Sequence, residues 1–221
     1  MINYFSSPKK KLSLKDKAFQ VIKLEIILGN LKPGSFLVEE KISKSMKISR
    51  GPIREAFNKL EKEGFVNIIP YKGTMVSNIT QQEVKDISRI REVLEPLAAI
   101  ESLPKISMSN LERLKKNFIE LSFVLENKTS KSYFFVLDRD FHKLLYSECG
   151  NRKLVEILDN FSDHTNWFMN LFIKKYPYEE SIKEHLLIIE AIRKKEVELV
   201  KLNIKKHLER VKNMILSEIS S

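Results

Sequence analysis

The sequence is poor in cysteine, glycine and proline, and it has no long apolar run. Its 221 residues include a single cysteine, Cys149, so the chain cannot form an internal disulfide and no second thiol can share a metal with it. Six glycines and seven prolines indicate few turns and much helix. The N-terminal residues show no signal-peptide pattern, and the apolar runs are too short for a bilayer. We therefore expect a cytoplasmic protein in a reducing environment, with no membrane partner.

The positive charge of the chain is concentrated in its first third. The net charge is +10, and residues 1–78 hold 15 Lys and Arg against 7 Asp and Glu. The remaining 143 residues hold 24 against 22. A basic module joined to a nearly neutral one suggests that the first binds a polyanion such as nucleic acid and that the second has another task. Ordinary solubility charge is the alternative.

The hydrophobic periodicity of the basic part predicts helices followed by a β-hairpin. The expected elements are helices near 14–28, 38–45 and 49–63, then strands at 65–69 and 74–77. Ser49 is expected to cap the third helix, and Gly64 to end it. Residues 10–78 thus resemble a winged helix-turn-helix, in which the third helix enters the major groove of DNA.

The pattern after a polar linker at 79–82 stays helical to the end of the chain. We expect helices near 81–103, 108–126, 130–149, 151–174, 178–195 and 196–219. These helices predict an antiparallel bundle over residues 83–218. The predicted fold class is therefore mainly α, with a winged helix-turn-helix of three helices and a β-hairpin followed by an all-α bundle.

The stretch "SRGPIREAFNKL" places two arginines at the start of the predicted recognition helix. Arg50 and Arg54 are four residues apart and share a face that the apolar stripe does not use. A cation in the first turn opposes the helix dipole, and contact with a phosphate or a guanine edge would explain its presence. A solvated helix face is the alternative. Further contacts with the DNA backbone are expected from Lys47, Ser49, Lys72 and Gly73.

Four metal-ligand residues stand out in the second part. Asp138 and His142 are four residues apart on one predicted helix, whereas His185 and His207 lie on two later helices. Helices of a bundle can direct such side chains to one point. One carboxylate with three imidazoles suits Zn, Ni, Mn or Fe. The alternative is that these residues are structural and that their spacing is accidental.

The segment "SRGPIREAFNKLEKEGFVNIIPYKGTMVSNIT" resembles the winged helix-turn-helix of GntR-family bacterial transcription regulators. The resemblance implies that Arg50, Arg54 and Gly73 contact operator DNA. Glu40 departs from relatives that place a DNA-contacting arginine there, which implies a different operator preference.

Residues 83–218 resemble the FCD ligand-binding domain of the FadR-type branch of this family. The matching pieces are "IREVLEPLAA", "DRDFHKLLYSECGN", "HLLIIEAI" and "KHLERV". The resemblance implies that Asp138, His142, His185 and His207 hold a divalent metal ion and that the domain senses a small organic acid. Arg91 is expected to bind the effector carboxylate beside the metal. A salt bridge between Arg91 and Glu95 is the alternative.

These expectations combine into a homodimeric regulator that binds double-stranded operator DNA and responds to a small carboxylate at a metal site. A metal-dependent hydrolase or lyase acting on a small carboxylate is the second hypothesis, because an open metal position can activate water. No nucleophile motif or phosphate loop supports it, and it leaves the basic module without a role. A purely structural metal is the third hypothesis.

Overall fold

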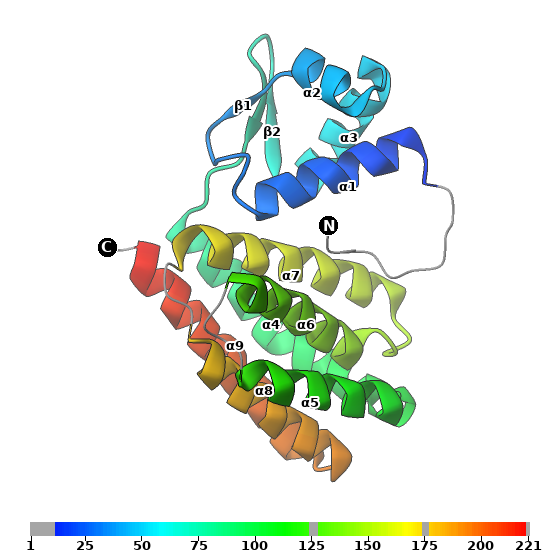
Figure 1. Cartoon of the computed structure of the whole chain (residues 1–221), viewed down its shortest axis with the longest axis vertical. Helices are drawn as coiled ribbons and strands as arrows, with labels where there is room; N and C mark the ends of the chain where they lie inside the picture. Colours follow the sequence, from blue (N-terminus) through cyan, green and yellow to red (C-terminus); the bar gives the residue numbers. More distant parts are fainter. Residues whose placement is uncertain (1–11, 124–127, 174–176, 220–221) are drawn as a thin grey trace. The chain divides into compact units, whose positions relative to one another are not determined.

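The computed structural model of the chain divides into two compact units, Met1–Thr80 and Gln81–Ser221 (Figure 1). It describes residues 12–123, 128–173 and 177–219. Residues 10–11 of the predicted DNA-binding domain lie outside these ranges. The predicted helix ends at 124–126 and 174 also lie outside them.

The first unit combines helices with a small antiparallel sheet. Its elements are α1 (Leu14–Ile27), β1 (Phe36–Leu37), α2 (Glu39–Met46), α3 (Arg50–Lys62), β2 (Val66–Ile69) and β3 (Gly73–Val76). Strand β3 lies between β1 and β2 and pairs antiparallel with both. The strand β1 was not predicted, because two residues are too few to show an alternating pattern; it pairs Phe36 with Met75.

The core of the first unit decides which face of α3 stays exposed. Ile53, Phe57 and Leu60 are fully buried, and α3 packs against α1 and β2. The predicted apolar stripe therefore faces inward, and the arginines four residues apart at the start of α3 remain outside. Gly64 follows the helix with a φ of 83°, a left-handed conformation that glycine adopts without a Cβ penalty.

The second unit is helical throughout the part that the structure describes. Its elements are α4 (Gln81–Ser102), the 3₁₀ helix η1 (Leu103–Lys105), α5 (Met108–Ser122), α6 (Lys128–Tyr146), α7 (Arg152–Phe172), α8 (Tyr178–Arg193) and α9 (Val197–Ile219). The predicted fold class, a winged helix-turn-helix followed by an all-α bundle, is confirmed. Among the helices of the described ranges, none combines the length and apolar character needed to cross a membrane.

Helix α4 lies at the centre of the bundle and brings charged groups into it. It packs against α6, α7 and α9 (Figure 1). Its buried positions recur at spacings of three and four, so one face of the helix points into the core. Arg91 and Glu95 lie on that buried face, at 4% and 0% exposure. Charged residues are seldom buried this deeply unless they are paired.

Candidate metal centre and nucleic-acid interface

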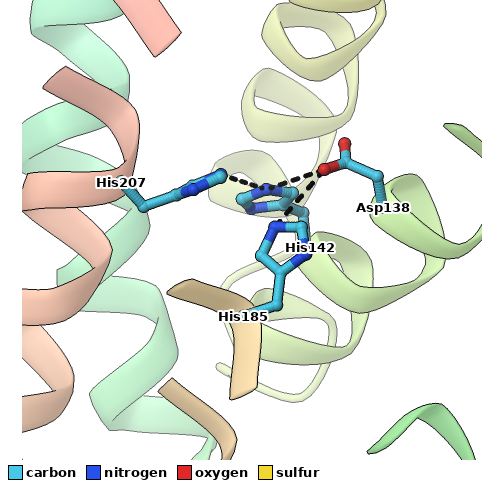
Figure 2. A group of neighbouring side chains, drawn as sticks. All are labelled: Asp138, His142, His185 and His207. Carbon is cyan, nitrogen blue, oxygen red and sulfur yellow. Dashed lines mark hydrogen bonds and ion pairs between the residues drawn. The ribbon is translucent and has the colours of Figure 1, made fainter. Parts of the chain in front are cut away.

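The four predicted metal ligands meet in the interior of the second unit. Asp138 and His142 come from α6, His185 from α8 and His207 from α9. All four side chains are buried, and one ligand atom of each lies within 4.8 Å of the corresponding atoms of the other three. Figure 2 shows these side chains pointing toward one another from α6, α8 and α9. Helical spacing alone could bring only the α6 pair together.

The distances between the ligand atoms suit a first-row transition metal. Nε2 of His207 lies 3.2 Å from Nε2 of His142, and Oδ1 of Asp138 lies 3.4 Å from Nε2 of His185. Oδ1 of Asp138 is 3.9 Å from Nε2 of His142. Ligands held about 2.1 Å from one ion are separated by about 3.0–3.4 Å from their neighbours. The separations of 3.2 and 3.4 Å already match this range, whereas the 3.9 Å between Asp138 and His142 must shorten for all four residues to hold one ion.

Two carboxylates outside the cluster determine which ring nitrogen faces inward in His142 and in His207. Nδ1 of His142 is hydrogen-bonded to Glu95, and Nδ1 of His207 lies 2.7 Å from Oε2 of Glu184. A carboxylate accepts, so each Nδ1 carries the hydrogen, and each neutral ring presents the lone pair of Nε2 to the cluster. Two lone pairs 3.2 Å apart repel each other unless a cation or a proton lies between them.

His185 supplies a second sign that these residues fit a metal ion. Both of its ring nitrogens are buried, and neither has a hydrogen-bond partner among the described residues. Burial, followed by the nearby charges that His207 and His142 can carry, holds the pKa of His185 well below its usual range. Burial also lowers the pKa of His207, although Glu184 opposes this shift. Neutral imidazole is the form that binds metals, so burial favours the binding-competent state.

Arg91 is paired inside the protein and also lies beside the cluster. Its Nε and Nη2 donate to Oε2 of Glu95 at 3.1 and 2.7 Å, and its Nη1 donates to Oγ1 of Thr165 at 2.9 Å. Burial alone would raise the pKa of Glu95, but Arg91 and His142 outweigh it and hold the pKa at about 2. The Arg91–Glu95 salt bridge, which was the alternative prediction, is thus present. It does not exclude effector binding, because Arg91 also lines the adjoining cavity.

The cavity next to the cluster is small and is lined by both polar and apolar side chains. It leaves about 10 Å³ for the centres of water molecules, which is room for about one water. An organic acid would need this cavity to widen. Its lining includes Arg91, Asp138, His142, Ser162, Thr165, Asn166 and His207.

The predicted DNA-contacting residues form an exposed group on the first unit. Arg50 and Arg54 lie in the first two turns of α3, with 57% and 66% of their side chains exposed. Ser49 is the N-cap residue of α3, as predicted, although its hydroxyl makes no capping hydrogen bond with the helix. The remaining predicted contacts are also exposed: Lys47, Lys72 and Gly73.

Acidic residues on α2 contact both arginines. Oε1 and Oε2 of Glu39 accept from Nε of Arg54 at 3.0 and 2.8 Å. Oε2 of Glu40 lies 3.4 Å from Nη2 of Arg50. These ion pairs restrict the orientation of the two guanidinium groups. The spacing of residues in the sequence did not predict them.

Comparison with known proteins assigns both units. Residues 14–76 match the family described as bacterial regulatory proteins, gntR family, and residues 86–210 match the FCD domain. The chain belongs to the GntR family of transcriptional regulators. It is 30% identical to the HTH-type transcriptional regulator YdhC of Bacillus subtilis, over 86% of this chain and 85% of that protein. It is 27% identical to the transcriptional repressor RspR of Escherichia coli, over 89% of this chain and 86% of that protein.

A solved structure of low sequence identity shares the fold. The structure titled E. coli McbR/YncC superposes with a TM-score of 0.81 at 20% identity, covering 95% of this chain and all of that one. The matched families and relatives are transcriptional regulators and not enzymes, so the enzyme hypothesis has no support. GntR regulators bind DNA operators, typically as dimers, and the FCD domain is associated with metal binding.

Several residues that support the site were not predicted as part of it. Glu184 orients His207, and Thr165 accepts from Arg91. Glu95 was expected only as a partner of Arg91, although it also bonds His142. Only the spacing of four between Arg91 and Glu95 gave a signal, because Glu95 lies 47 residues from His142 and Glu184 lies 23 residues from His207.

Proposed function

We propose that this GntR protein is a ligand-responsive regulator that binds operator DNA as a homodimer and senses a small carboxylate at a metal site. In this proposal residues 10–78 bind DNA, residues 79–82 link the domains and residues 83–218 hold the effector. The observation that carries the proposal is the buried Asp138, His142, His185 and His207 cluster beside a buried arginine. Such a site has no evident purpose in a protein that only binds DNA.

The proposed ligands are Asp138 and the three histidines, with Glu95 and Glu184 orienting two of the rings. When bound, a Zn, Ni, Mn or Fe ion supplies a positive centre to which one effector oxygen can bind. Arg91 then binds the second oxygen of the carboxylate with a nitrogen that now contacts Glu95 or Thr165.

The effector must move part of the bundle, because the cavity has room for about one water. Arg91 lies on α4, which begins at Gln81, the first residue after the DNA-binding unit. A displacement of Arg91 by the effector would therefore be transmitted to the linker along one continuous helix. The effector alters DNA binding only if it binds one arrangement more tightly than the other.

A screen of small carboxylates by thermal shift, with the metal retained, tests this sensing role. A ligand that binds the native state raises its melting temperature, and the same ligand should change operator affinity. If chelation lowers the melting temperature while no carboxylate in a broad panel raises it, the metal is structural and the sensing proposal is wrong.

We expect Arg54→Ala to weaken operator binding by about 1–3 kcal/mol, because a guanidinium that reads a base contributes about that much. Fluorescence anisotropy with a labelled duplex measures the change. Arg113→Ala is the matched control, since Arg113 is exposed on α5 of the other unit and carries the same charge. Equal affinity of the Arg54 variant and wild type would remove Arg54 from the interface.

The proposed dimer surface lies on α4 and α9. Val93, Leu97 and Leu202 are 62%, 48% and 46% exposed, and they line a groove of about 430 Å³. Glu198 and Lys201 line the same groove and pair with each other at 2.7 Å, so these two residues add no net charge that would repel a second copy. An exposed apolar patch whose bordering charges are balanced fits a second copy of the chain, in agreement with the dimers typical of the family.

Replacing Leu97 by Glu should convert the dimer into a monomer. Two-fold symmetry would place two unpaired carboxylates in the apolar contact, and we expect the dimer dissociation constant to rise at least about 100-fold. Sedimentation velocity over a range of concentrations measures it. Ile157→Glu is the control, because Ile157 is 42% exposed on α7, away from this groove. A Leu97 variant that stays dimeric would place the interface elsewhere.

A further inference from the structure

Glu39 has an unusual relation to the recognition helix. It is the first residue of α2, and both of its carboxylate oxygens accept from Nε of Arg54, at 3.0 and 2.8 Å. The two side chains are 31% and 66% exposed, so this ion pair contributes little to folding stability. Its importance is therefore geometric, because it restricts the orientation of an otherwise flexible arginine.

The contact leaves the base-reading end of Arg54 available. Glu39 occupies only Nε, and the two terminal nitrogens have no hydrogen-bond partner among the described residues. An arginine reads guanine by donating two hydrogen bonds to O6 and N7. Fixing the guanidinium before DNA arrives reduces the side-chain entropy lost on binding.

The neighbouring acid behaves differently. Glu40 contacts a terminal nitrogen of Arg50 at 3.4 Å, and its other oxygen lies 2.9 Å from Lys44. This contact occupies the end of the arginine that would meet DNA, so it must break on binding. Glu40 therefore opposes DNA binding by its charge and does not hold an arginine in a reading orientation.

We propose that Glu39 is a positioning residue that determines sequence specificity by holding Nε of Arg54. The inference rests on the proposed DNA-binding function and deepens it, since it assigns a role to an acidic residue in a surface that otherwise attracts phosphates. A negative charge at this place lowers the affinity for every duplex, while the hydrogen bonds it accepts favour the duplex that Arg54 reads.

The test compares two probes and three variants. The probes are a duplex selected by the wild-type protein from a random library and a scrambled duplex of the same composition. Glu39→Ala removes both the charge and the acceptor, whereas Glu39→Gln removes the charge and keeps an oxygen that can accept from Nε. Glu40→Ala is the matched control one residue away. The side chains are at the surface, so the variants should fold, which circular dichroism verifies.

We expect Glu39→Ala to reduce the ratio of selected to scrambled affinity about tenfold, with scrambled binding unchanged or tighter. Glu39→Gln should keep the ratio within about threefold of wild type. Glu40→Ala should tighten binding to both probes by similar factors. An unchanged ratio in Glu39→Ala, an equal loss in Glu39→Gln, or an equal loss in Glu40→Ala would each overturn the proposal.

This design separates the inference from the proposed function. If the wild-type protein selects no preferred duplex from the library, operator recognition itself fails. If it selects one and Glu39→Ala binds it with full preference, only the role of Glu39 fails.

Discussion

Glu95→Ala is expected to lower the unfolding free energy of the helical unit by about 3–5 kcal/mol, because it leaves Arg91 charged and buried without its partner. Glu95 is completely buried and accepts two hydrogen bonds from Arg91 as well as bonding His142. Urea unfolding of the metal-free protein measures the loss. Trp167, the single tryptophan of the chain, is fully buried in this unit, so its fluorescence reports this transition.

Two further variants show whether burial of the pair is the cause. Glu120→Ala removes an exposed ion pair of the same unit, that with Lys116, whose side chains are 63% and 76% exposed, and it should cost no more than about 1 kcal/mol. The double variant Arg91→Met with Glu95→Leu removes both charges and should recover most of the loss. A remaining cost of about 1–3 kcal/mol is expected, because His142 keeps an unsatisfied Nδ1. A loss for Glu95→Ala as small as that for Glu120→Ala would refute the argument.

His185→Ala is expected to reduce bound metal from about one ion per chain to less than about a tenth. It removes a ligand that α8 alone supplies and that has no other hydrogen-bond partner among the described residues. In the wild type, chelation should lower the unfolding free energy by about 3–4 kcal/mol if the free ion is 100- to 1,000-fold above its dissociation constant. In the variant, chelation should change little.

The control for this variant is His164→Ala. His164 is equally buried, on α7, but it is not part of the ligand cluster. Elemental analysis of the purified, folded proteins should find full metal in the His164 variant and little in the His185 variant. Equal metal in His185→Ala and wild type would show that the cluster is not the binding site.

Local periodicity accounts for most of the secondary structure that could be predicted. Helix α3 was predicted within one residue, because an apolar stripe, a capping serine and a terminal glycine all mark it. The strand β1 was missed because its two residues gain their conformation from pairing with β3 and not from their own pattern. Ser49 was predicted as the N-cap residue and is one, although its hydroxyl makes no capping hydrogen bond, so the residue type indicated the cap position and not the hydrogen bond.

The candidate site, like the secondary structure, was predicted only in part from the sequence. Spacing within α6 determined that Asp138 and His142 share a face. His185 and His207 were singled out as two of only four histidines, and the resemblance to FCD domains supported them. Periodicity could not show that α8 and α9 bring those histidines within 4.8 Å of the other two ligands. Nor could it show that Glu184 bonds His207, 23 residues further along the chain.

The sequence by itself determined the family, the fold class, the basic first unit and the residues that point outward from α3. Only the tertiary structure decided which groups meet: Glu39 with Arg54, Glu95 with both Arg91 and His142, and the ligands with one another. The physical reason is that a helix sets the faces of its own residues every 3.6 positions. Contacts between helices depend on how the whole core packs, and no single segment contains that information.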